Sequence, residues 1–128
     1  MVVPLGRQHA LLFGDMTGWF YALQSETGKL LWKVHIETHD STRLTGAPVA
    51  YNGTVYVPVA SWEELRASDP DYPCCTFRGS VVALRISDGT RLWKTYMTAE
   101  QHFARKIPAR RAVNHRVAQF LRVPGQFQ

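Results

Sequence analysis

The first 100 residues alternate apolar and polar side chains over short runs, which is the period of a β-strand. In the clearest run, residues 54–60, every second residue is a valine, at positions 55, 57 and 59. Asn52-Gly53 stands just before this run, and an Asn-Gly pair between two apolar runs is a strong signal for a tight hairpin turn. The pattern therefore predicts an antiparallel hairpin with strands near 47–50 and 54–60.

An internal repeat predicts two further hairpins. The sequences GWFYALQSETGKLLWK (residues 18–33) and GSVVALRISDGTRLWK (residues 79–94) share seven identities in sixteen positions at a constant offset of 61 residues. Each copy starts with aromatic and β-branched residues, passes through a turn with glycine, and ends in Leu-Trp-Lys. We therefore expect strands near 19–24 and 30–35 in the first copy and near 80–86 and 91–96 in the second.

The repeat predicts an all-β fold. Four-stranded antiparallel sheets in series are the blades of a β-propeller, so residues 1–100 are expected to form a partial propeller. The first blade is expected over 9–35 with three strands, starting with 9–14, and the second over 47–96 with four strands and an inserted loop at 61–78. A closed propeller has about four to eight blades, so the remaining blades are expected from a longer parent protein or from partner chains.

Charge divides the chain of 128 residues at about position 100. Its net charge of +5 comes from the last 28 residues, because residues 101–128 carry six Arg and Lys residues and no acid. This basic tail is expected to be disordered or a short helix, and its change of composition suggests a truncation or an altered reading frame. A basic amphipathic helix for a membrane or nucleic acid is the alternative, and a nucleic-acid partner is not expected. No secretory signal is visible at the N-terminus.

The repeat resembles that of the pyrroloquinoline quinone (PQQ) enzymes, which are eight-bladed propellers. The motif YALxxxTGxxxW and its second copy VALxxxDGxxxW carry the resemblance, which covers about residues 9–97. It implies that Trp32 and Trp93 dock each blade onto its neighbour, with Gly28 and Gly89 in the same motif. The repeat also occurs in propellers without a cofactor, such as the outer-membrane assembly lipoprotein, so it implies the fold rather than the chemistry.

The cysteines Cys74 and Cys75 are adjacent in the expected insert and are followed by Arg78-Gly79. By themselves they could be two reduced thiols in a loop, and Arg78 could be a plain surface charge. Together with the repeat, however, they resemble the vicinal pair of quinoprotein alcohol dehydrogenases. The sequence around them, from YVPVASWEE to CCTFRGSVVAL, looks most like the polyvinyl-alcohol dehydrogenase branch. This resemblance implies a Cys74–Cys75 disulfide that stacks on PQQ and a cofactor contact from Arg78.

The resemblance implies three possible functions. The first is a part of a periplasmic PQQ-dependent alcohol dehydrogenase, which uses calcium and passes electrons to a cytochrome c. Neither the catalytic base nor the calcium ligands are expected in this chain, and alone it is expected to be inactive. The second is a non-catalytic propeller that acts as a protein-binding scaffold, and the third is a degenerate or truncated product without activity.

Other polar and aromatic clusters are expected to be structural. We expect a surface loop around His35, His39 and Asp40, because a strand-to-loop context does not suit a metal site. Trp62 starts the insert and could line a pocket, but packing is the simpler interpretation. The acidic residues of the insert, Glu63, Glu64, Asp69 and Asp71, do not have the spacing of a calcium loop and are expected to be solvated.

Overall fold

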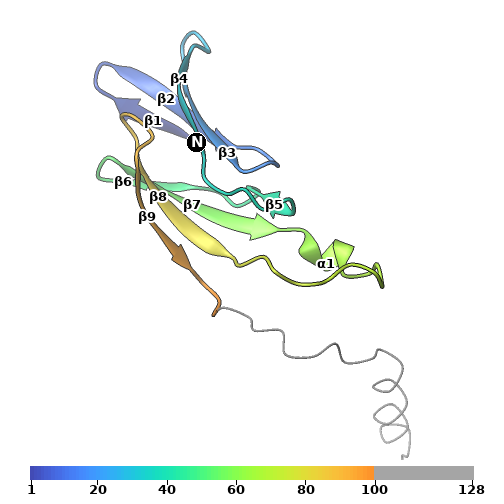
Figure 1. Cartoon of the computed structure of the whole chain (residues 1–128). Coiled ribbons are helices and arrows are strands. Elements are labelled where there is room, and N and C mark those ends of the chain that lie inside the picture. Colours follow the sequence, from blue (N-terminus) through green and yellow to red (C-terminus); the bar gives the residue numbers. More distant parts are fainter. Residues whose placement is uncertain (100–128) are drawn as a thin grey trace, which may run out of the picture.

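Two antiparallel β-sheets, stacked on one another, make up the part of the chain that the structure describes (Figure 1). The structure is a computed structural model, and it describes residues 1–99. The first sheet is built from four consecutive strands in the order β1-β2-β3-β4. These are β1 (Val2–Leu5), β2 (Gln8–Gly14), β3 (Trp19–Gln24) and β4 (Leu30–His35).

The second sheet has five strands and carries the insert. Its order is β5-β7-β8-β9, and β6 pairs with β7 beside this path. The strands are β5 (Thr42–Arg43), β6 (Val49–Tyr51), β7 (Thr54–Ser61), β8 (Ser80–Arg85) and β9 (Arg91–Tyr96). The only helix within residues 1–99, α1 (Glu63–Arg66), lies in the segment that joins β7 to β8.

The hairpins predicted from the repeat are confirmed, and so is the turn at Asn52-Gly53. Both central residues of that turn have positive φ, 46° at Asn52 and 74° at Gly53, as an Asn-Gly hairpin requires. Gly28 and Gly89 also have positive φ, 71° and 75°, in the turns of the two repeats. The glycine signals therefore placed the turns correctly.

The number of strands differs from the expectation in both sheets. The expected three strands of the first unit are wrong, because β1 pairs antiparallel with β2 and buries Val3. Pro4 is tolerated there because β1 is an edge strand. The second sheet has five strands rather than four, because the two residues of β5 pair with Ser61 and Ala60 at the end of β7.

The core lies between the two sheets. Alternating residues of β2 and β3 point into it from the first sheet, and the valines of β7 with residues of β8 point into it from the second. Its fully buried members include Leu12, Phe20, Val55, Val57, Val82 and Leu84. Each sheet thus has one apolar face covered by the other. No helix among residues 1–99 has the length and apolar character needed to cross a membrane.

Candidate functional site

The insert brings the two cysteines together as a bonded pair. Cys74 and Cys75 form a disulfide within the loop that leads from α1 to β8. Both residues are partly exposed. The loop has no regular secondary structure from Pro73 to Gly79, so its backbone groups need partners outside a sheet ladder.

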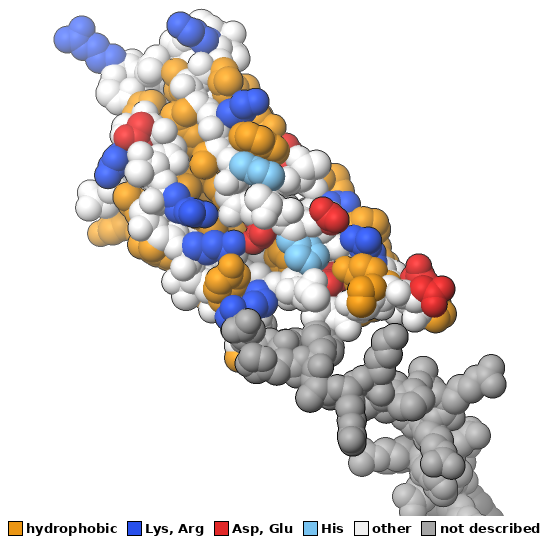
Figure 2. All heavy atoms as spheres, viewed as in Figure 1, with side chains coloured by type: hydrophobic (Ala, Val, Ile, Leu, Met, Phe, Trp, Pro, Cys, Tyr) orange, Lys and Arg blue, Asp and Glu red, His pale blue; other side chains and the backbone are white. Residues whose placement is uncertain are grey.

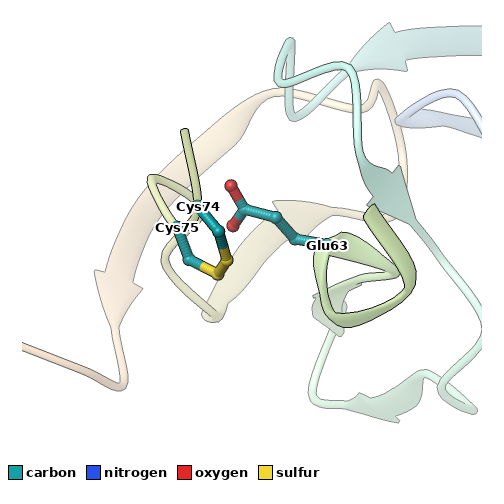
Figure 3. A group of neighbouring side chains, drawn as sticks. All are labelled: Glu63, Cys74 and Cys75. Atoms are coloured by element: carbon teal, nitrogen blue, oxygen red, sulfur yellow. A yellow bond between two sulfur atoms is a disulfide. The ribbon is translucent and has the colours of Figure 1, made fainter. Parts of the chain in front are cut away.

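Glu63 supplies two of those partners. Figure 3 shows its side chain extending from α1 toward the loop that carries the disulfide. One carboxylate oxygen, Oε1, accepts hydrogen bonds from the Tyr72 hydroxyl and the Thr76 backbone N–H, and Oε2 accepts one from the Phe77 N–H, all at 2.8 Å. These donors lie on both sides of the cysteine pair, so one carboxylate holds both ends of the disulfide loop.

The environment of Glu63 keeps it ionised. Its side chain is buried, with 3% of its surface exposed. Burial alone raises the pKa of a carboxyl, but the hydrogen bonds from Thr76, Phe77 and Tyr72, with a smaller contribution from His39, outweigh it and lower the pKa below 4.5. The expectation that the acidic residues of the insert are solvated is therefore wrong for Glu63, although Glu64, Asp69 and Asp71 are exposed.

His39 joins the loop after β4 to the disulfide loop. Its Nδ1 accepts the Ser41 backbone N–H at 3.1 Å, so the proton of the neutral ring is on Nε2, which lies 2.9 Å from the Thr76 hydroxyl. That hydroxyl in turn lies 3.4 Å from Glu63 Oε1. His35 and Asp40 are exposed as expected, but His39 is half-buried and part of the support of the insert.

A second set of contacts fixes α1 to the same region. Arg66 donates to the Ser41 hydroxyl at 3.2 Å, and its guanidinium lies over the Tyr72 ring at 4.4 Å from the ring centre. The Trp62 backbone N–H donates to the Ser41 carbonyl at 3.1 Å, and the Arg43 guanidinium lies over the Trp62 ring. The buried Ser41 therefore anchors the start of the insert, and Trp62 packs rather than lining the hollow beside the loop.

The Arg78 side chain binds the end of the second sheet. Its Nε and Nη2 donate to the Thr98 carbonyl at 3.2 and 2.8 Å, and its guanidinium lies 4.0 Å from the centre of the Tyr96 ring. These two hydrogen bonds use two of the five guanidinium N–H donors, so both N–H groups of Nη1 and one of Nη2 have no partner among residues 1–99. A cofactor contact from Arg78 therefore stays a prediction.

The group Glu63, Cys74 and Cys75 does not fit a calcium ion. Their potential ligand atoms lie within 4.8 Å of one another. The sulfur atoms are bonded to each other, however, and both Glu63 oxygens accept hydrogen bonds. Calcium takes six to eight oxygen ligands, so these residues are suited to support the loop and not to hold the metal.

A hollow of about 410 Å³ opens beside the disulfide loop, and His39, Arg66, Tyr72 and Thr76 are among its lining residues. A larger hollow, of about 650 Å³, lies between β1 and the turns of the second sheet and has no lining residue from the insert. Figure 2 shows basic side chains along the stacked sheets and acidic side chains at the outer end of the insert. The lining of the hollow beside the disulfide includes one acidic residue, Asp40, and one basic residue, Arg66.

The two repeated tryptophans have different surroundings. The Trp32 indole donates Nε1–H to the Ile86 carbonyl at 2.8 Å and lies against Gly89, so it reaches from the first sheet to the second. Trp93 has 45% of its surface exposed and contacts Tyr56 of its own sheet. Gly28 is exposed, and no described atom lies within 4 Å of where its Cβ would be.

The two stacked antiparallel sheets match consecutive blades of a β-propeller, whose blades are four-stranded antiparallel sheets. The model of the PQQ_2 family, described as outer membrane protein assembly factor BamB, matches residues 2–121. The chain therefore belongs to this family of PQQ-repeat proteins.

Curated relatives are dehydrogenases. The chain is 40% identical over 94 residues to a polyvinylalcohol dehydrogenase of Pseudomonas sp. This match covers 73% of this chain and 15% of the relative. A second polyvinylalcohol dehydrogenase, of Sphingopyxis sp. (strain 113P3), is 41% identical over 92 residues, covering 72% of this chain and 14% of the relative. The chain thus spans about a seventh of the length of these relatives.

Solved structures agree on the fold. A europium-containing methanol dehydrogenase superposes with a TM-score of 0.57 at 26% identity, over 77% of this chain and 15% of that one. The quinohemoprotein alcohol dehydrogenase ADHIIG from Pseudomonas putida HK5 gives 0.55 at 24% identity, over 74% of this chain and 12% of that one. The predicted all-β partial propeller is confirmed.

Proposed function

We propose that this chain supplies the vicinal-disulfide face of the cofactor site in a PQQ-dependent alcohol dehydrogenase. The observation that carries the proposal is the Cys74–Cys75 disulfide, partly exposed in a loop that the buried Glu63 holds from both sides. The similarity to two polyvinylalcohol dehydrogenases supports an alcohol, including a polymeric one, as the substrate.

The residues present fit one face of a planar quinone. The disulfide offers an apolar surface against which a flat ring can stack, and the Glu63 hydrogen bonds keep that surface in place without occupying it. Arg78 would contribute a fixed positive charge toward the anionic oxygens of the cofactor. When bound, PQQ supplies the hydride acceptor for oxidation of an alcohol.

The remaining parts of the enzyme would come from other blades. We propose that an eight-bladed parent provides the catalytic base, the calcium ligands and the other blades, with a cytochrome c as electron acceptor and the periplasm as its compartment. Trp32 and Trp93, with Gly28 and Gly89, would join neighbouring blades. By itself the chain is proposed to be inactive, because it contributes one wall of the site.

A scaffold without a cofactor is the second candidate. Two observations favour it: the matching family model carries the description of an assembly factor, and the Arg78 guanidinium is already bound to Thr98 and Tyr96. A scaffold would have no use for the disulfide, so the behaviour of the cysteines toward PQQ separates the two candidates.

The test is retention of PQQ by the full chain in equilibrium dialysis, after oxidising refolding and again after reduction. Intact mass with and without an alkylating reagent first establishes the state of the cysteines. We expect a mass about two units low and no alkylation before reduction. Because the chain supplies one wall of the site, we expect weak PQQ retention, which is lost on reduction and in Cys74→Ser. Asp71→Asn, an exposed change in the same insert, is the matched control. Two freely alkylated thiols, or equal retention by the oxidised and reduced chains, would overturn the proposal.

A further inference from the structure

The hollow beside the disulfide loop is formed by two segments that lie far apart in the sequence. The loop after β4 contributes residues 38–40, and the insert contributes Arg66, Tyr72, Pro73 and Thr76. Pro73 and Thr76 directly flank the two cysteines, so a molecule in the hollow would lie next to the disulfide. The volume of about 410 Å³ falls within the range of roughly 300–1,000 Å³ that is usual for small-ligand pockets.

Two opposite charges line this hollow without pairing with each other. Asp40 and Arg66 both belong to the lining, but neither takes part in the ion pairs found among residues 1–99. The Asp40 carboxylate is exposed and accepts no hydrogen bond from the described residues. Arg66 donates to the Ser41 hydroxyl, and its four other guanidinium N–H groups have no partner in the same part of the chain. One segment therefore offers an unused acceptor and the other offers unused donors.

Hydroxyl groups supply most of the remaining polar lining. The Thr38 hydroxyl has no hydrogen-bond partner among residues 1–99, and Thr38 is exposed. The Tyr72 hydroxyl donates to Glu63 and keeps its capacity to accept, and the Thr76 hydroxyl lies between His39 and Glu63. Because a hydroxyl both donates and accepts, these groups suit a neutral ligand whose own polar groups do the same.

Carbon surface accompanies the polar groups of the hollow. The Pro73 side chain is exposed, and the Tyr72 ring is half-buried with the Arg66 guanidinium 4.4 Å from its centre. Asp40 and Thr76 are exposed as well, so the hollow is open at its edge and admits a segment of a longer chain. A ligand that matches this lining has hydroxyl groups separated by short stretches of carbon.

We propose that the hollow binds a segment of a carbon chain that carries a hydroxyl group on every second carbon. One hydroxyl of the segment donates to the Asp40 carboxylate, and a neighbouring hydroxyl accepts from the Arg66 guanidinium. The carbon atoms between them lie against Pro73 and Tyr72. The inference rests on the proposed function, because it places the polymeric alcohol next to the disulfide that forms the proposed cofactor face.

A zwitterion is the competing occupant. Its ammonium group would pair with Asp40 and its carboxylate with Arg66. Taking two full charges out of water costs free energy, however, and a neutral alcohol does not carry that cost. The unpaired Thr38 hydroxyl and the Pro73 surface also favour the alcohol.

The test is affinity electrophoresis of the full, oxidised chain in native gels that contain fully hydrolysed poly(vinyl alcohol), without PQQ. We expect the polymer to retard the wild type in a concentration-dependent way. Asp40→Ala should weaken the apparent affinity about fivefold, the usual effect of losing one hydrogen bond, and Thr38→Val should weaken it by less. Asp71→Ala is the matched control, because it removes the same charge from an exposed position of the insert outside the lining.

Competition identifies the chemistry of the occupant. Pentane-2,4-diol has the same hydroxyl spacing as the polymer and should release the chain, whereas γ-aminobutyrate, a zwitterion, should not. Release by γ-aminobutyrate alone would assign the hollow to a zwitterion and overturn the proposal. A wild type that the polymer does not retard would overturn it too, as would an Asp40→Ala variant that is folded by circular dichroism and retarded like the wild type.

The result is separable from the test of the cofactor site. A chain that retains PQQ in dialysis but is not retarded by the polymer would reject this inference and leave the proposed cofactor face standing. Retardation that depends on Asp40, in a chain that does not retain PQQ, would support the hydroxyl site and reject the cofactor face alone.

Discussion

The ring of Trp32 lies so close to Gly89 that a Cβ there would come within 2.6 Å of the indole Cε3. These residues are 57 positions apart and belong to different sheets. A glycine is required at position 89 for two separate reasons, the positive φ of the turn and the space taken by the indole. At Gly28, the equivalent position in the first repeat, the first reason alone applies.

This difference predicts unequal effects of the same substitution. Gly28→Ala should reduce the free energy of unfolding by about 1–2 kcal/mol, the cost of a left-handed conformation for alanine. Gly89→Ala should cost about 1–3 kcal/mol more, because the new methyl group displaces the Trp32 ring. Urea denaturation at low protein concentration measures both. Equal losses for the two variants would mean that the Trp32 contact tolerates the methyl group.

The ion pair between Lys94 and Glu37 predicts a second matched comparison. Both side chains are largely buried, with exposed fractions of 16% and 13%. Burial raises the pKa of Glu37. The hydrogen bonds from Lys94 and from the backbone N–H groups of His39 and Thr38 lower it by more, so the net effect is a lowered pKa and an ionised carboxyl.

Lys94→Met should therefore leave a buried carboxylate without its cation and cost about 1–3 kcal/mol of unfolding free energy. Lys33→Met, at the same place in the first repeat, removes an exposed ammonium and should change the free energy by less than about 0.5 kcal/mol. Thermal unfolding of both variants checks the comparison. A Lys33 effect as large as that of Lys94 would contradict the role of the ion pair.

Glu63→Gln should loosen the disulfide loop. A glutamine side chain has one acceptor oxygen, and its NH₂ group would face backbone N–H donors of Thr76 or Phe77. We expect a loss of about 2–3 kcal/mol, as for hydrogen bonds to a charged group. Hydrogen exchange should rise at residues 72–77.

Glu64→Gln is the control for this change, because Glu64 is exposed beside it. It should leave both stability and hydrogen exchange in the loop unaltered. Protection at residues 72–77 that survives Glu63→Gln would show that other contacts, such as those of His39, hold the loop.

Acid should weaken the fold through the same carboxylate. The pKa of Glu63 is below 4.5 in the folded chain, so the unfolded chain binds its proton first as the pH falls. The stability that Glu63 contributes is therefore complete above its ordinary pKa and is lost as the pH falls through the lowered one. The midpoint temperature of unfolding of the wild type should decrease as the pH falls below about 5. The midpoint of the Glu63→Gln variant should depend less on pH. Parallel curves for the two proteins would contradict this assignment.

Sequence reasoning was most successful where the signal was local. The strands of both repeats, the Asn52-Gly53 turn and the positive φ at Gly28 and Gly89 follow from residue type and spacing over a few positions. The strand β1 was missed because Val2–Leu5 has little alternation of its own and is defined by pairing with β2. The burial of Glu63 was missed because a Glu-Glu pair in an insert is usually solvated.

Residue order alone is enough to show a repeated set of antiparallel hairpins with one insert that carries the two cysteines. Alternation, turn glycines and the offset of 61 residues are properties of neighbouring positions, so they can be read along the chain. The three-dimensional packing was needed to show that Trp32 is covered while Trp93 is exposed, and that Glu63 is the residue that holds the disulfide loop. These outcomes depend on which surfaces meet in space, because burial and hydrogen-bond partners come from contacts between residues distant in the sequence.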